Sequence, residues 1–291
     1  MKRDYPRLDI YEFGEHLLTS GDLDPVYIAL HRAELDEDHL YRWLLAYWCF
    51  YHCGVASYMS EFKGEEFWQQ MLIAGQNTYG CPVGERWPRG SERRHFRGEA
   101  CIHALHKMRE RFPDPAEAAR WIAAAGEDPE VPVPYVEVAA RAKGLPLFGP
   151  WIAFKVADML DRLGIQAVNF DRAAVFMFDD PTKAALKLWR QHEKLPEDAQ
   201  PKDDATKDRI IDNVVNHLTE HFKDHTAPPI HERPVALQEV ETILCKWKSH
   251  MNGHYPPYND IDEIRAGLAS WATVSETARA ILHAMPEPEG S

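Results

Sequence analysis

An arginine-rich segment, Trp87–Gly98 (WPRGSERRHFRG), stands out in an otherwise acidic chain. The net charge of the protein is −13, yet residues 85–98 carry five Arg against two Glu. Guanidinium groups bind phosphates and carboxylates through paired hydrogen bonds, so this composition predicts a local anion site. An acidic protein does not bind nucleic acid by bulk attraction, which makes a focused site the better interpretation. The candidate residues are Arg89, Arg93, Arg94, Arg97 and His95.

The segment is expected to lie at the start of a helix, 92–112, with Ser91 as its N-cap. On that helix Arg93 and Arg97 are four residues apart and share a face. Arg94 points about 100° away from Arg93, so one helix would serve two anions. The alternative is that some of these arginines pair with acids elsewhere in the chain.

A second cluster of reactive groups lies in VETILCKWKSHMNGHYP, within an expected helix over 235–251. Lys246 and Lys248 are candidates to bind a phosphate or a carboxylate. Cys245 is a candidate nucleophile, and the neighbouring lysines are the local groups that would activate its thiol. Trp247 is expected to be a core residue or a stacking residue. Helical spacing places Glu241 on the face of Cys245 and Lys248, and His250 on the face of Lys246. Glu241 and His250 complete the candidates of this cluster.

Lys155, Asp158 and Arg162 share one face of an expected helix over 150–163. Two interpretations stay open. The three side chains form a solvated ladder of ion pairs, or Lys155 and Asp158 form a buried pair in an otherwise apolar helix.

No metal site and no disulfide framework are predicted. His217, His221 and His225 have metal-binding spacing but lack a fourth partner, so a solvated helix end is favoured. The number of cysteines, five, is odd, and Cys49 and Cys53 fall within an aromatic run, where thiols act as small hydrophobes.

Helical periodicity dominates the chain, so the expected fold class is all-α, with an extended pair of residues near Val168. A helix is expected over 38–59, an exposed loop over 193–207 and a flexible tail over 286–291. The chain is expected to be one helical domain, 1–291, or two subdomains of about 1–130 and 131–285 with the site between them. No membrane-spanning run and no signal peptide are present, which predicts a cytoplasmic protein.

The stretch GLPLFGPWIAFKVADML (144–160) resembles the helix–hairpin–helix element of DNA base-excision glycosylases. In those enzymes the hairpin amides and the following helix N-terminus hold a DNA phosphate. By resemblance, the DNA-binding residues are Gly149, Trp151 and Arg172. Leu147 replaces a glycine of the pattern, which weakens the amide site. The alternative is an ordinary αα-hairpin.

The position of the glycosylases' catalytic aspartate falls on Asn169 in this chain, with Asp171 two residues later. A neutral amide does not stabilise an oxocarbenium ion or activate a nucleophile. The resemblance therefore favours the glycosylase fold over glycosylase chemistry. The candidate catalytic residues are Asp171, Asp158, Lys155 and Asn169.

Three segments, WPRGSERRHFRG, LFGPWIAFKVADMLDR and VETILCKWKSHMNGHYP, together resemble a narrower family. These are the phage amino acid:DNA transferases, also described as α-glutamyl/putrescinyl thymine pyrophosphorylases, and the resemblance covers about residues 5–270. It implies that an amino acid such as glycine, or a polyamine, replaces phosphate or pyrophosphate on the 5-methylene of 5-hydroxymethyluracil in phage DNA. The expected setting is the host cytoplasm.

That chemistry implies roles for the residues. The arginines would hold the departing phosphate, a DNA phosphate or the amino acid carboxylate. Asp171 or Asp158 would take the proton of the attacking amine. The target base is expected to flip out of the duplex into a pocket that excludes water. No nucleotide-binding loop is present, and no cofactor, metal or membrane is required.

Two other functions stay open at this stage. The first is an active DNA glycosylase with Asp171 as its acid group, which Asn169 disfavours. The second is a noncatalytic DNA-binding helical module, which the clustered arginines and lysines disfavour.

Overall fold

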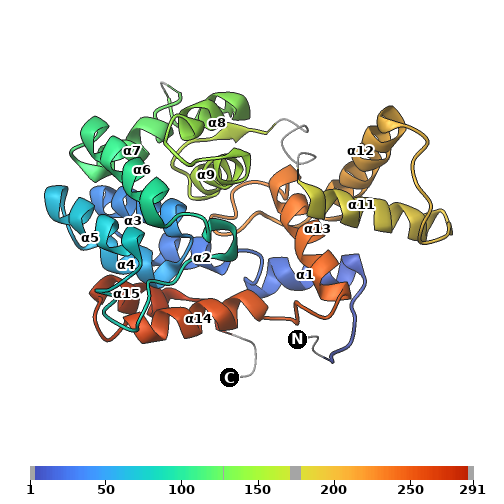
Figure 1. Ribbon diagram of the computed structural model, residues 1–291. Coiled ribbons are helices and arrows are strands. Elements are labelled where there is room, and N and C mark those ends of the chain that lie inside the picture. The colour runs from blue at the N-terminus through green and yellow to red at the C-terminus, as the bar shows by residue number, and fades with distance from the viewer. Residues whose placement is uncertain (1–3, 127, 171–177, 288–291) are drawn as a thin grey trace. The chain divides into compact units, whose positions relative to one another are not determined.

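The computed structural model describes residues 4–126, 128–170 and 178–287 of the chain. These residues form an α-helical structure, as the sequence predicted (Figure 1). The strands among them are β1 (Val133–Pro134) and β2 (Val168–Asn169), which pair in parallel and include the extended residues expected near Val168. Within the described part, no helix combines the length and apolar character that crossing a membrane requires.

The chain forms two compact units, each assembled from separate stretches. Unit 1 consists of Met1–Asp24, Phe170–Ile261 and Glu287–Ser291, and unit 2 of Pro25–Asn169 and Asp262–Pro286. Unit 2 includes the position near residue 130 where a subdomain boundary was expected. The subdivision made from the sequence stays a prediction, and residues 288–291 of the expected tail lie outside the described residues.

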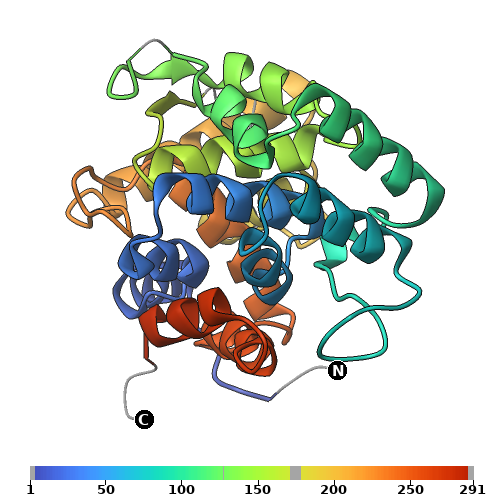
Figure 2. The same cartoon turned by 90° about the vertical axis from the view of Figure 1, so that its left-hand side faces the viewer.

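Unit 2 carries the arginine segment and the hairpin. Its elements, including α14, which starts in unit 1, are α2 (Pro25–Ala33), α3 (Glu37–Phe50), α4 (Cys53–Ser60), α5 (Gly64–Gln76), η1 (Ser91–Arg93), α6 (Gly98–Arg111), α7 (Pro115–Ala123), β1, α8 (Tyr135–Lys143), α9 (Pro150–Arg162), β2, α14 (Asn259–Trp271) and α15 (Glu276–Ala284). In unit 2, α15 packs against α4 and α2, and Figure 2 shows the red C-terminal helices beside blue helices from the N-terminal part of the chain. Large apolar side chains, among them Trp43, Trp48 and Phe154, are fully buried in this unit.

The expected helix over 38–59 is wrong, because the chain turns at Tyr51 and His52. Tyr51 ends α3 in the left-handed conformation, with φ of 51°. His52 then starts α4 as its N-cap, since its Nδ1 atom accepts a hydrogen bond from the Val55 amide at 3.2 Å. Aromatic periodicity continues across this break, so the sequence pattern alone does not reveal it.

The expected helix over 92–112 is also wrong at its start. Residues Ser91–Arg93 form one short 3-10 turn, and α6 begins only at Gly98, whose φ is 70°. This conformation favours glycine, and it separates the turn from the helix. Arg93 and Arg97 therefore do not share a helix face.

In the described part of unit 1, an apolar core is surrounded by the helices α1 (Ile10–Ser20), α11 (Asp179–His192), α12 (Asp204–His221) and α13 (Leu237–Met251) (Figure 1). The sequence analysis did not predict α1. Gly14 lets this helix approach Phe222 closely, since a Cβ atom there would lie 2.3 Å from the ring. Trp247 is buried in the core, as expected.

The expected loop over 193–207 is too long at its C-terminal end. Asp203 caps α12 by accepting a hydrogen bond from the Thr206 amide at 2.7 Å. Residues 204–207 are consequently helical.

Candidate functional site

The arginine segment (Trp87–Gly98) and the hairpin (Gly144–Gly149) meet at Arg93, whose side chain is only 1% exposed. Its Nε atom donates to the Cys49 carbonyl at 3.0 Å, near the C-terminus of α3. Its Nη1 atom donates to the Leu147 carbonyl at 2.9 Å, inside the hairpin. Arg93 therefore joins α3, the arginine segment and the hairpin, and a helix C-terminus is an electrostatically favourable place for its charge.

Arg93 and Arg89 also carry buried donors that have no partner. The Nη2 atom of Arg93 and the Nε and Nη1 atoms of Arg89 make no hydrogen bond, while Arg89 Nη2 donates to the Ala74 carbonyl at 3.0 Å. Within the described part of the chain, neither guanidinium has a carboxylate at ion-pair distance. Burial lowers the pKa of both groups. Buried donors without partners are costly, so these atoms mark a place where an anion would be stabilised.

The surroundings of the two guanidiniums are apolar and aromatic. Arg93 lies 4.7 Å from the centroid of the Phe96 ring and 5.1 Å from that of Phe148. Arg89 lies 5.5 Å from the Phe50 ring centroid. Aromatic faces compensate part of the charge but do not supply hydrogen-bond acceptors of anionic strength.

Arg94, His95 and Arg97 are exposed, unlike Arg93. Burial, followed by the nearby guanidiniums of Arg93 and Arg94, lowers the pKa of His95. The imidazole is therefore biased toward its neutral form, which can accept a proton. The segment thus offers one buried cation, Arg93, one half-buried cation, Arg89, and a separate exposed group.

The hairpin leads from α8 into α9, and α9 matches the predicted range of 150–163 closely. Leu147 has a φ of 64°, so it adopts the left-handed conformation that the glycine of the glycosylase pattern would favour. Gly149 is exposed and is the N-cap of α9, with no side chain capping the helix. Pro150 at the first helical position has no amide to leave unpaired. Leu147 thus adopts the left-handed conformation at the position where the glycosylase pattern has glycine, and phosphate binding by this hairpin stays a prediction.

Trp151, in the first turn of α9, is half-buried. Its ring meets Tyr51 edge-on at 4.9 Å between centroids. The same Tyr51 ends α3, which Arg93 also contacts through Cys49. The first turn of α9 is thus packed against the end of α3.

Lys155 and Asp158 are buried on α9, so the interpretation as a solvated ladder is wrong. Asp158 is fully buried, and it accepts a hydrogen bond from the Tyr27 hydroxyl at 2.8 Å. The Lys155 ammonium lies 3.7 Å from the same carboxyl oxygen. Arg162 is also buried and lies 4.6 Å from the Tyr27 ring centroid. The contacts with the Tyr27 hydroxyl and with each other hold the Asp158 carboxylate and the Lys155 ammonium in place.

Tyr27 is the residue of this cluster that the sequence analysis missed. It lies 131 residues before Asp158, on α2. No local pattern connects two positions so far apart. A buried tyrosine in an apolar helix is also an ordinary core residue in sequence terms.

Asn169 lies on β2, is exposed, and faces Pro134 in the parallel register. Asp171 and Arg172, two candidates from the sequence, lie outside the described residues. Their proposed parts in proton transfer and DNA binding stay predictions.

In unit 1, both lysines of the second cluster have acidic partners. The Lys246 ammonium lies 2.7 Å from an Asp260 carboxyl oxygen and donates to the Asp22 carbonyl at 2.8 Å. Lys248 forms an ion pair with Asp180, at the start of α11. Asp22 itself is fully buried, and burial raises the pKa of its carboxyl to about 6. Lys246 therefore belongs to a buried polar network that joins α13 to the start of α14.

His250 is fully buried, and its two ring nitrogens are both engaged. Nε2 accepts from the Leu8 amide at 2.8 Å, and Nδ1 lies 2.8 Å from the Tyr255 carbonyl oxygen. These contacts require the neutral tautomer with its proton on Nδ1. Burial lowers the pKa of His250, which agrees with that form.

The other two candidates of this cluster lie on α13. Glu241 is buried, and the Thr242 hydroxyl lies 3.4 Å from one of its carboxyl oxygens. Cys245 is a half-buried thiol without a disulfide bond. In the described residues, no group of three or more His, Cys, Asp or Glu is arranged to hold a metal ion.

The comparisons with known proteins agree with one another. The family model described as "Amino acid:DNA transferase" matches residues 16–254. The chain is 48% identical to a glycinyltransferase of Pseudomonas phage PaMx11, over 99% of each chain. It is 25% identical to a putrescinyltransferase of Delftia phage PhiW-14, over 83% of this chain and 72% of that protein.

Proposed function

Because this chain belongs to the amino acid:DNA transferase family, we propose that it attaches glycine to the 5-methylene of phosphorylated 5-hydroxymethyluracil in phage DNA. The protein is a transferase of the phage DNA-hypermodification type. Glycine is the favoured donor because the glycinyltransferase is far more similar to this chain than the putrescinyltransferase is. The proposed place of action is the host cytoplasm, where phage DNA is replicated.

The proposal is carried by two neighbouring arginines, the buried Arg93 and the half-buried Arg89. Both have buried donor atoms without a hydrogen-bond partner, and neither has a carboxylate at ion-pair distance among the described residues. In the reaction, the C–O bond to phosphate breaks and the phosphate leaves with the bonding electrons. The amine nitrogen forms a new C–N bond to the methylene carbon and loses a proton. Fixed guanidinium donors stabilise the charge that develops on the leaving oxygen, and they do so more strongly in a water-poor setting. The same donors would serve a pyrophosphate leaving group.

We assign the exposed part of the segment and the hairpin to the DNA. Arg94, Arg97 and the amides at the start of α9 would contact backbone phosphates, and Gly149 leaves room for that approach. Trp151, and Arg172 further along the chain, would extend this contact. The modified base would flip out of the duplex, because the displacement needs protection from competing water.

The proton of the attacking amine needs an acceptor. Asp171 and His95 are the proposed acceptors, and Asp158 is the third candidate. The contacts of Asp158 with Tyr27 and Lys155 support a positioning part for that carboxylate, which would fix the Lys155 ammonium. Asn169, at the position of the glycosylase aspartate, is neutral, which argues against base excision.

A nucleoside analysis by mass spectrometry tests the proposal. The protein is incubated with two DNA substrates, one carrying 5-phosphomethyl-deoxyuridine and one the pyrophosphorylated form, with glycine, putrescine or neither. The expected product, after digestion, is a thymidine bearing glycine on its methyl carbon, together with one equivalent of released phosphate or pyrophosphate. Release of a free base would instead establish a glycosylase. Unchanged DNA in all reactions would refute the proposal.

A further inference from the structure

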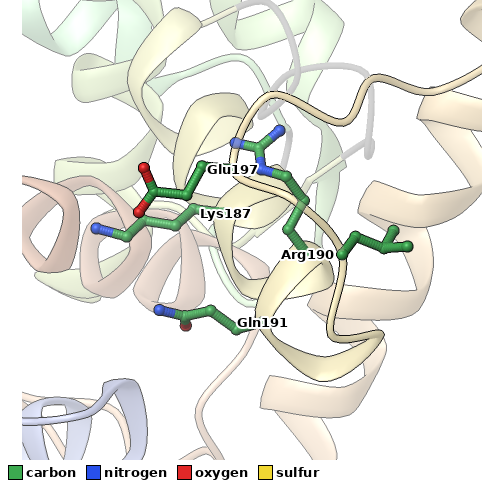
Figure 3. A pocket seen from close by; sticks show the side chains of 5 residues that line it. Lys187, Arg190, Gln191 and Glu197 are labelled. Atoms are coloured by element: carbon green, nitrogen blue, oxygen red, sulfur yellow. The ribbon is translucent and has the colours of Figure 1, made fainter.

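Unit 1 contains a small charged hollow that the sequence analysis did not single out. It has a volume of about 260 Å³ and lies between α11 and the loop that follows it, and we call it the α11 hollow. Its lining residues are Lys187, Arg190, Gln191, Leu195 and Glu197 (Figure 3). Two cations, one carboxylate, one amide and one apolar side chain thus surround the same space.

Lys187 is the most unusual of these groups. It is half-buried, and its ammonium lies 5.6 Å from the centroid of the Trp247 ring. Burial lowers its pKa, Glu197 opposes this change, and Arg190 adds to it. Across the described residues, no carboxylate lies at ion-pair distance from Lys187. The ammonium is therefore partly desolvated and has no carboxylate close to it among the described residues, which favours binding of an anion.

The opposite wall is held in place by backbone contacts. The Leu195 amide donates to the Arg190 carbonyl at 2.9 Å, and Arg190 Nη1 donates to the Ala199 carbonyl at 3.0 Å. The Ala199 amide in turn donates to the Pro196 carbonyl at 3.0 Å. Glu197 lies in the middle of this fixed turn. The backbone that carries Glu197 is consequently held by hydrogen bonds, which lowers the entropic cost of ordering this loop on binding.

The residue types match the two ends of a free α-amino acid. Lys187 and the free side of the Arg190 guanidinium suit a carboxylate, and Glu197 suits an ammonium group. Figure 3 shows Lys187 and Glu197 extending to the left of the view, Gln191 below them, and Arg190 to their right with its guanidinium pointing upward. Two cations against one acid leave the wall with one net positive charge. A diamine, which carries two positive charges and no anion, is electrostatically disfavoured in such a site.

From this arrangement we infer that the α11 hollow binds a free α-amino acid, with Lys187 and Arg190 on its carboxylate and Glu197 on its ammonium group. The inference rests on the proposed function, because it names the α11 hollow as the subsite of the glycine donor. It also gives that subsite a reason to prefer glycine over putrescine. Leu195, 38% exposed, is the apolar residue of the lining.

Isothermal titration calorimetry on the full chain tests the inference directly, with glycine, acetate and putrescine as separate ligands. Glycine is expected to bind more tightly than acetate, and putrescine is expected not to bind. Lys187→Met should weaken glycine binding by about tenfold or more, since a charge-assisted contact is lost. Glu197→Gln should reduce glycine binding to the level of acetate and leave acetate binding unchanged. Equal binding of glycine to both variants and to the wild type would overturn the inference, as would tight binding of putrescine.

The matched control is Lys183→Met, one helical turn before Lys187 on α11. Lys183 is exposed and pairs with Asp179, so this variant removes a lysine of the same helix outside the hollow. It is expected to bind glycine as the wild type does. Thermal melts of all variants identify any that fail to fold.

A second measurement separates this inference from the proposed function. In the nucleoside assay, Lys187→Met should raise the KM for glycine by about the factor lost in binding, with a smaller effect on kcat. If the wild type transfers glycine but the variant keeps its KM, the subsite is refuted and the function stands. If the wild type binds glycine at the hollow but modifies no DNA substrate, the function is refuted and the binding site stands.

Discussion

The Nη1 atom of Arg93 donates to the carbonyl oxygen of Leu147 at 2.9 Å, which ties the arginine segment to the hairpin. The same guanidinium holds the Cys49 carbonyl through Nε and leaves Nη2 unpaired. One buried cation thus has two structural contacts and one donor available for an anion. In Arg89, by contrast, one nitrogen makes a structural hydrogen bond and two nitrogens have no hydrogen-bond partner. The two arginines should therefore respond differently to substitution.

Replacing Arg93 should mainly cost stability. In Arg93→Lys, a single ammonium on a shorter, non-planar head does not reach both carbonyls, so at least one buried acceptor loses its partner. We expect the free energy of unfolding to fall by about 2–3 kcal/mol, measured by urea denaturation. An unchanged midpoint would show that the two contacts of Arg93 do not stabilise the unit.

Replacing Arg89 should mainly cost activity. Arg89→Met keeps much of the volume, removes a half-buried charge that has no carboxylate partner among the described residues, and loses one hydrogen bond, so stability should change little. The rate of glycine transfer should fall by about a hundredfold, the scale of a lost transition-state donor. The comparison is Arg86→Met, which removes an exposed arginine from the same stretch and should leave the rate unchanged. Equal rates in all three proteins would remove Arg89 from the site.

Replacing Leu147 by glycine should cost less stability than replacing it by a β-branched residue. Its left-handed backbone is strained for leucine, and glycine removes that strain while it adds freedom to the unfolded chain. The free energy of unfolding in Leu147→Gly should stay within about 1 kcal/mol of the wild type, whereas Leu147→Val should lose about 1–2 kcal/mol. Urea unfolding of both variants gives the comparison. A larger loss with glycine than with valine would contradict the left-handed turn.

The hairpin and its helices could be predicted from the sequence because their signals are local. Proline at the first position of α9 and the glycines on both sides of the turn mark the boundaries, and the apolar spacing gives the helices. The arginine segment could not be predicted in the same way. Arg93 is buried by contacts with residues 44 and 54 positions away, and no periodicity encodes such contacts. The break at Tyr51 was hidden because aromatic residues continue on both sides of it.

The ion pairs of Lys246 and Lys248 also could not be predicted from a local sequence pattern. Two lysines near a cysteine predict an anion site when only their helix is known. Their partners, Asp260 and Asp180, come from other elements and are invisible to a pattern read along α13. The hollow on α11 was missed because Glu197 faces Lys187 only once the loop folds back.

Acid should destabilise unit 2 through His52. Burial lowers the pKa of this imidazole from 6.5 to about 4, and its Nδ1 must stay unprotonated to cap α4. The unfolded state thus binds a proton at a higher pH than the folded state does, so stability is complete above pH 6.5 and falls as the pH drops toward 4. We expect the free energy of unfolding to fall by about 3 kcal/mol between pH 6.5 and pH 4 because of His52.

Urea unfolding at several pH values checks this expectation. His52→Asn keeps a capping acceptor without a titrating ring, so the pH dependence between 6.5 and 4 should become shallower. Substituting the exposed His254 in the same way should leave the slope as it is in the wild type. A slope that does not change in His52→Asn would assign the acid sensitivity to other groups.

Substitution of Lys246 should lower the stability of the protein much more than substitution of Lys248, the other lysine on α13. Lys246 is 11% exposed and neutralises Asp260 beside the buried Asp22, so Lys246→Met leaves acidic groups without their cation. We expect a loss of about 3–5 kcal/mol, as for other broken buried pairs. Lys248 and Asp180 are 26% and 48% exposed, so Lys248→Met should cost less than about 1 kcal/mol. If both variants unfold at the same urea concentration as the wild type, Lys246 is not a structural cation. That result would favour the first interpretation of Lys246, as a residue that binds a phosphate or a carboxylate.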